Sequence, residues 1–167
     1  MQTRACFPAR CEGGCTSMRS ESKILAGKGR ALLVVNPCAG RTKGRLYADL
    51  LETHLHNAGV PVIRCETTAE ENGANYAASA ALAGCRRIFC IGGDGTLNAV
   101  INGMLGAGAN LPITYIPAGT TNDFARTLKL PRRIGDMRRV LASGRDVAID
   151  AGRFNDGYFS YVASFGA

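Results

Sequence analysis

Short, continuous runs of apolar residues alternate with longer amphipathic segments between residues 31 and 130. Such runs are typical of strands that lie buried on both faces of a parallel sheet. They predict strands at residues 31–35, 60–65, 88–91 and 111–116. The segments between them place apolar residues at helical spacing and predict helices at 45–57, 68–82 and 97–105. This alternation predicts an α/β fold, with an open, mostly parallel sheet that carries helices on both faces.

The first two helices carry signals for their faces and ends. In the first helix we expect Leu46, Leu50 and Leu51 to face the core. Thr68 and Glu71 have the spacing of a capping box, in which each side chain binds a backbone N–H group at the start of a helix. We therefore expect the second helix to begin at this pair.

The pattern changes after residue 145. Two β-type segments, residues 146–150 and 158–163, flank Asn155-Asp156-Gly157, which is a hairpin turn signature. We therefore expect an antiparallel β region to begin here. Residues 1–29, in contrast, show no periodicity. The chain is expected to divide into a poorly ordered extension at 1–29, an α/β lobe at 30–145 and the start of a truncated β-rich lobe at 146–167.

Three of the predicted strands run into glycine-containing loops, at residues 36–44, 92–98 and 117–123. Glycine lets the backbone approach a bulky ligand closely, and the N-terminus of a following helix favours phosphate. Thr96 is placed to cap the helix or to donate its hydroxyl to a phosphate oxygen. Loops at the carboxyl ends of strands in an open α/β sheet meet at one edge, where ligands bind. The loops therefore predict a phosphate-binding edge, and tight turns without a ligand are the alternative.

Composition and charge narrow the classes of partner. With 46% hydrophobic and 20% charged residues over 167 positions, the chain has the composition of one globular domain. Its net charge of +7 favours anionic partners, namely nucleotide phosphates, an acidic membrane face or nucleic acid. We do not expect nucleic acid, because aromatic residues are not interleaved with the basic residues of 126–145. A solvated basic face is the alternative to peripheral membrane contact.

The chain contains no signal for a membrane span or for export. No apolar run approaches the ~18 residues that span a bilayer, and the first residues lack the apolar core of a signal peptide. We therefore expect a cytoplasmic protein, peripheral at the membrane if it contacts one. The odd number of cysteines, seven, fits reduced thiols. Four of them lie in or beside strand or turn segments: Cys38, Cys65, Cys85 and Cys90.

Taken together, the three loops carry a family resemblance. Asn36-Pro37-x-Ala39-Gly40, the segment Gly92–Asn98 and Pro117-x-Gly119-Thr120-x-Asn122-Asp123-Phe124 resemble the diacylglycerol kinase catalytic domain, and more narrowly the soluble bacterial lipid kinases related to diacylglycerol and sphingosine kinases. The Gly-Gly-Asp-Gly-Thr element alone also occurs in nicotinamide-dinucleotide kinases and has a relative in phosphofructokinases, which share this type of fold. The third loop favours the lipid branch.

The resemblance implies a lobe that binds ATP with Mg²⁺. By this resemblance Asp94 would help to organise the phosphate and magnesium region, and the metal ligands themselves stay unassigned. The residues implied to bind ATP are Asn36, Pro37, Cys38, Ala39, Gly40, Thr67, Gly92, Gly93, Asp94, Gly95, Thr96, Leu97, Asn98, Gly119, Thr120 and Asn122. Thr68 is an alternative to Thr67 in this role.

The resemblance also implies the reaction, which is transfer of a phosphoryl group to the hydroxyl of diacylglycerol or a similar neutral lipid at the membrane surface. In the family, the base that deprotonates this hydroxyl comes from an Asp-Gly-Glu-type element of a second lobe, and no such element occurs here. We therefore expect the chain to be an incomplete fragment of a lipid kinase. Two alternatives stay open, a non-catalytic ATP-binding module and a dinucleotide kinase.

Overall fold

The computed structural model describes residues 2–7, 29–41, 43–131 and 133–160, and the apolar runs become strands in it. The strands are β1 (Gln2–Phe7), β2 (Arg30–Val35), β3 (Val62–Glu66), β4 (Cys85–Gly92), β5 (Ile113–Pro117), β6 (Arg145–Asp150), β7 (Gly152–Phe154) and β8 (Gly157–Phe159). The helices are α1 (Lys43–Asn57), α2 (Ala74–Ser79), α3 (Asp94–Gly106), α4 (Asp123–Thr127) and α5 (Ile134–Ser143).

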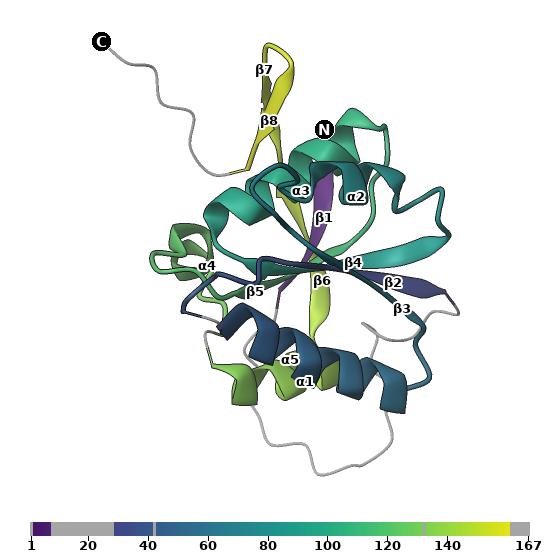
Figure 1. The fold of residues 1–167 in the computed structure, drawn as a ribbon. Coiled ribbons are helices and arrows are strands. Elements are labelled where there is room, and N and C mark those ends of the chain that lie inside the picture. Colours follow the sequence, from purple (N-terminus) through teal and green to yellow (C-terminus); the bar gives the residue numbers. More distant parts are fainter. Residues whose placement is uncertain (1, 8–28, 42, 132, 161–167) are drawn as a thin grey trace.

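The first six strands form one sheet in the order β3-β2-β4-β5-β1-β6. All neighbours pair in parallel except β1 and β6, which are antiparallel. Helices α2 and α3 lie on one face of the sheet, and α1 and α5 lie on the other (Figure 1). The predicted α/β architecture, a mostly parallel sheet covered on both faces, is therefore confirmed.

The two faces of the sheet carry separate apolar cores, because successive side chains of a strand point to opposite sides. Leu32 and Val34 of β2 belong to the core under α2 and α3. Leu33 and Val35, the residues between and after them, pack in the core under α1 and α5. This is why the central strands read as continuous apolar runs rather than as alternating patterns.

The inward face of α1 differs from the prediction. Its buried residues are Gly44, Ala48, Leu51 and Leu55, whose spacing makes one stripe along the helix. Leu46 and Leu50 lie off this stripe and are 55% and 45% exposed, so their predicted place in the core is wrong. Only Leu51 of the three leucines was placed correctly.

The segment expected to open the second helix is a turn instead. The Thr68 hydroxyl accepts the N–H groups of Glu70 and Glu71, and the Thr68 N–H donates to the Glu71 carbonyl. Threonine side chains that bind nearby backbone in this way compete with helix formation. Helix α2 consequently begins at Ala74, after Gly73 in the left-handed region at φ 100°, and the capping-box prediction is wrong.

The main sheet includes two segments that were expected to lie outside it, residues 2–7 and residues 146–150. Residues 2–7, predicted to be poorly ordered, form β1, whose Ala5 pairs with Ile113 on one side and Val147 on the other. The remainder of the predicted extension, residues 8–28, lies outside the described residues. Strand β6 was expected to be part of the β-rich lobe and belongs to the main sheet instead, so this sheet continues to Asp150.

The predicted hairpin turn is present, with different partner strands. Strands β7 and β8 pair in antiparallel fashion around Asn155 and Asp156, so the turn prediction is confirmed. The first strand of the hairpin is Gly152–Phe154 rather than residues 146–150. No helix in the described part of the chain is both long and apolar enough to cross a membrane.

An ion pair between a buried arginine and a partly exposed aspartate connects the centre of the sheet to its edge. The guanidinium of Arg87 on β4 donates from Nη1 and Nη2 to Asp146 Oδ1 and Oδ2 on β6, both at 3.0 Å. It also donates to the Thr114 hydroxyl on β5 at 3.2 Å. This one side chain therefore links three strands, β4, β5 and β6.

Candidate functional site

The glycine loops that follow β2, β4 and β5 meet at one edge of the sheet. Together with the loop after β3, they line a cleft of about 450 Å³. The cleft is lined by Asn36, Cys38, Ala39, Gly40, Thr67, Thr68, Asn72, Gly93, Gly95, Thr96, Gly119 and Thr120. None of these residues is acidic, and most are threonine, asparagine or glycine, which suits a bound anion.

The structure thus brings together most of the predicted site residues from all three loops and from Thr67. Six do not line the cleft: Pro37, Gly92, Asp94, Leu97, Asn98 and Asn122. Sequence reasoning missed Asn72, which lies in the loop between β3 and α2. The available signal was position alone, because this loop also follows the carboxyl end of a parallel strand.

Two glycines allow the second and third loops to touch. A Cβ atom added at Gly119 would lie 2.7 Å from Gly93 Cα and 2.8 Å from Asn122 Oδ1. The first loop reaches the third in a similar way, because a Cβ at Gly40 would collide with the Ala118 carbonyl. Gly40 also has φ 58°, a conformation that favours glycine. The cleft walls are therefore held together by close backbone contacts.

Asp94 connects the second loop to the third through its carboxylate. Its Oδ2 accepts the N–H of Asp123 at 2.9 Å, and its Oδ1 accepts the N–H of Phe124 at 3.3 Å. These donors are the first residues of α4, so a negative charge lies at the positive end of that short helix. Both oxygens bind backbone N–H groups, so Asp94 holds the start of the third loop's helix and does not line the cleft.

Hydrogen bonds of the buried residues Tyr115 and Asn122 hold the third loop in place. The Tyr115 hydroxyl lies 3.3 Å from the Gly92 carbonyl and 3.3 Å from Asn122 Oδ1, and Asn122 Nδ2 donates to the Gly119 carbonyl at 2.6 Å. Burial raises the pKa of Tyr115 above its usual range, and the charge of Asp94 acts in the same direction. The hydroxyl therefore keeps its proton at neutral pH and remains a donor.

Thr96 joins the first loop to the second. Its hydroxyl accepts a hydrogen bond from Asn36 Nδ2 at 3.3 Å, while Asn36 Oδ1 accepts the N–H of Cys38 at 3.0 Å. The N-cap of α3 is Gly93, so the predicted capping role of Thr96 is wrong. The residue lies instead in the first turn of the helix and is one of the residues that line the cleft.

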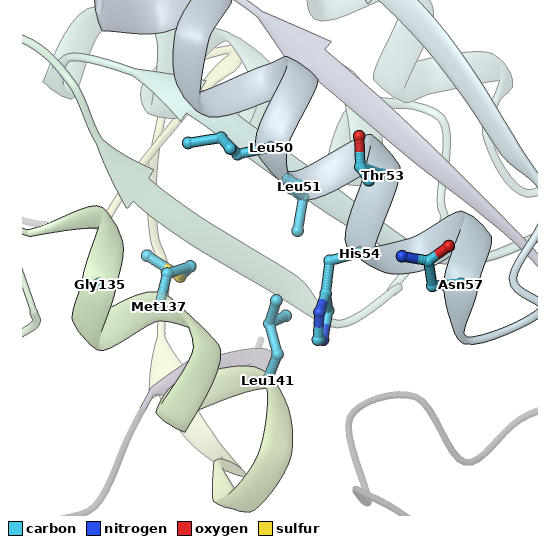
Figure 2. Close-up of a pocket in the computed structure, with 8 residues that line it drawn as sticks. All are labelled: Leu50, Leu51, Thr53, His54, Asn57, Gly135, Met137 and Leu141. Atoms are coloured by element: carbon cyan, nitrogen blue, oxygen red, sulfur yellow. The ribbon is translucent and has the colours of Figure 1, made fainter.

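A second, smaller pocket of about 290 Å³ lies between α1 and α5. Figure 2 shows Leu50, Leu51 and His54 on α1 opposite Met137 and Leu141 on α5. Its lining is mostly apolar and includes none of the predicted site residues. It therefore offers little to a phosphate, and the loop cleft is the better candidate site.

Comparison with known proteins agrees with this geometry. The profile described as "Diacylglycerol kinase catalytic domain" matches residues 30–154, a stretch that includes every described residue lining the cleft. The chain belongs to the diacylglycerol kinase family. Within this family, it is 34% identical over 138 residues to a diacylglycerol kinase of Bacillus subtilis (strain 168), a match that covers 82% of this chain and 46% of the relative. It is 31% identical over 137 residues to a diacylglycerol kinase of Staphylococcus carnosus (strain TM300), a match that covers 82% of this chain and 45% of the relative.

A solved structure of the family shares the fold. The crystal structure of a diacylglycerol kinase from Bacillus anthracis str. Sterne aligns with a TM-score of 0.63 and 27% sequence identity. The alignment covers 80% of this chain and 46% of that chain. The chain thus spans a little under half the length of the family members that it matches.

Proposed function

We propose that this chain forms the ATP-binding lobe of a lipid kinase, which transfers a phosphoryl group from ATP to the hydroxyl of diacylglycerol or a similar neutral lipid. The observation that carries the proposal is the meeting of three glycine loops in one cleft without acidic lining residues, in a member of the diacylglycerol kinase family. Such a cleft does not repel phosphates, and its backbone can approach them closely.

The N-terminus of α3 supplies the main phosphate-binding element of this proposal. The first N–H groups of an α-helix have no partner within the helix, and the helix dipole adds positive potential there. Gly93, Gly95 and Thr96 bring this end of α3 to the cleft, and Thr67 and Thr120 add hydroxyl groups nearby. Phosphoryl transfer requires positioning and charge neutralisation more than covalent chemistry, which this arrangement can supply.

We propose that Asp94 organises the site rather than acting as its base, because backbone N–H groups occupy both of its oxygens. Mg²⁺ would enter with ATP and neutralise phosphate charge, since this ion is held largely by substrate phosphates and water. The described residues contain no group of three or more His, Cys, Asp or Glu side chains that could hold a metal ion. We therefore assign the ion to the nucleotide.

The base that takes the proton of the lipid hydroxyl lies outside this cleft in our proposal. No carboxylate or imidazole is present among the described residues that line it. The lipid acceptor would be bound at a membrane surface, and the net charge of +7 supports peripheral contact with anionic head groups.

Protection of Cys38 from alkylation tests the nucleotide site. Cys38 is exposed and lines the cleft, so we expect saturating MgATP to slow its reaction with iodoacetamide at least fivefold. Burial raises the pKa of the Cys90 thiol, so Cys90 should stay unmodified in the folded protein and serve as an internal control. Peptide mass spectrometry measures both residues in one sample. An unchanged Cys38 rate with MgATP would contradict the proposed site.

A competition between acceptors then separates lipid kinase activity from its alternatives. Vesicles that contain diacylglycerol and free nicotinamide dinucleotide are offered together with γ-labelled ATP. Label in the lipid supports the proposal, and label in the dinucleotide supports a dinucleotide kinase. Protection of Cys38 without any labelled acceptor would support ATP binding by this lobe, and would mean that the chain does not transfer the phosphoryl group without the region that supplies the base.

A further inference from the structure

One side chain of α3 binds the backbone of the β7–β8 hairpin. Asn102 Oδ1 accepts the N–H of Tyr158 at 2.7 Å, and Asn102 Nδ2 donates to the Tyr158 carbonyl at 2.7 Å. These are two short hydrogen bonds from one carboxamide to both polar groups of one residue. They join positions 56 residues apart in the chain.

The register of the hairpin explains why Tyr158 is the residue that is bound. Phe154 and Gly157 face each other beside the two-residue turn, and Arg153 faces Tyr158 in the next pair. Hydrogen-bonded and non-hydrogen-bonded pairs alternate in an antiparallel ladder, so the N–H and carbonyl of Tyr158 point away from β7. Asn102 satisfies these two groups, as a third strand would.

The same helix forms one wall of the cleft. The first turn of α3 carries Gly95 and Thr96, and Asn102 lies about two turns further along. Asn102 Nδ2 also donates to the Asn98 carbonyl at 2.9 Å, which fixes its side chain on the helix. Figure 1 shows the hairpin projecting from the sheet beside α3.

We propose that Asn102 is a positioning residue, which fixes the β7–β8 hairpin to α3 and so sets where residues 152–159 lie relative to the helix whose first turn lines the cleft. This proposal deepens the proposed function and rests on it for the identity of the cleft ligand. Asn102 does not line the cleft itself. Its role is to hold the hairpin on the helix that also forms one wall of the cleft.

Amide hydrogen exchange resolved at Tyr158, combined with MgATP titration, tests this role. In Asn102→Ala we expect the Tyr158 amide to exchange at least tenfold faster, because it loses its acceptor. The amides of Val100 and Met104 in α3 should keep their protection, since alanine favours a helix. The affinity for MgATP should stay within twofold of the parent. Asn57→Ala, which changes an exposed asparagine at the end of α1, is the matched control and should alter none of these values.

The outcomes separate positioning from a general structural role. Faster exchange throughout α3 and β4, together with weaker MgATP binding, would mean that Asn102 supports the fold, and would overturn the proposal. Unchanged exchange at Tyr158 would overturn it as well. If the parent chain does not bind MgATP while Tyr158 responds as expected, the proposed function fails and the positioning of the hairpin stands.

Discussion

Asp94 connects two loops of the cleft although it does not line the cleft itself. Its two oxygens receive backbone N–H groups from the start of α4, and this contact joins two of the glycine loops. Hydrogen bonds to a charged acceptor contribute about 1.5–3 kcal/mol each. The carboxylate is therefore expected to matter for both the stability of the loop and the shape of the cleft.

The change Asp94→Asn tests this role with little change in side-chain size. The new amide N–H₂ group would face a backbone N–H donor, so one hydrogen bond is lost and two donors oppose each other. We expect the free energy of unfolding to fall by about 1–3 kcal/mol and MgATP to bind at least tenfold more weakly. Urea unfolding and calorimetric titration measure these effects. Asp156→Asn, at the exposed hairpin turn, is the control, and equal behaviour of the two variants would contradict the role of Asp94.

At the scale of residues, the sequence predicted most of the residues that meet at the cleft. It did not predict the hydrogen-bond partners of their side chains. Glycines and hydroxyls after strands predicted the loop edge, because the carboxyl ends of parallel strands meet there. The partners of Asp94 and Thr96 lie 29 to 60 positions away, and no local pattern encodes such contacts. Asn72 was missed for a different reason, because its loop carries no glycine signal as strong as those of the other three loops.

Helices α2 and α3 pack through a glycine. A Cβ atom at Gly103 would collide with the carbonyl of Ala74, the first residue of α2, whereas a Cβ at Gly106 would meet nothing within 4 Å. The two glycines belong to the same helix and differ only in what lies opposite them. Close contact at Gly103 therefore sets the distance between the two elements that cover this face of the sheet.

Alanine at these two positions should have opposite effects. Gly103→Ala must push α2 and α3 apart, and such overpacking costs about 1–3 kcal/mol of unfolding free energy. Gly106→Ala should be neutral or stabilise by up to about 1 kcal/mol, because alanine favours the helix. Thermal and urea unfolding of both variants measure the difference. A stable Gly103→Ala variant would show that α2 moves away at no cost.

At the scale of elements, the buried strands were the easiest features to predict and the helix ends were the hardest. Strands β2, β4 and β5 are covered on both faces, so burial alone imposes their apolar runs. The start of α2 depended on whether Thr68 caps a helix or closes a turn, and both use the same residue types. In α1, packing against the sheet decides which side of the helix is buried. The apolar pattern of the helix alone did not show which side this is.

Strand β1 completes the sheet of the whole molecule. It fills the position between β5 and β6, and without it these two strands would lack a common neighbour. Six residues are too few to show a reliable period, and their place is decided by pairing partners more than 100 positions away. This is why the sequence did not predict the strand.

The change Ala5→Pro tests the contribution of β1 to the molecule. Ala5 has partners on both sides, and proline removes a ladder donor from a central strand. We expect the free energy of unfolding to fall by about 3 kcal/mol, with lost amide protection in β6. Ala5→Gly, which keeps the N–H group, should cost only about 1 kcal/mol. Equal stability of the two variants would mean that the backbone of β1 contributes little.

The ion pair between Arg87 and Asp146 has a consequence for dividing this protein into parts. A piece excised after residue 145 would retain the guanidinium and lose both oxygens that it binds. Arg87 is buried, and the loss of its charged hydrogen-bond partner costs about 2 kcal/mol, a noticeable share of the stability of a small domain. A fusion junction or a split point is therefore better placed after Asp150, so that the α/β lobe keeps the carboxylate that pairs with Arg87.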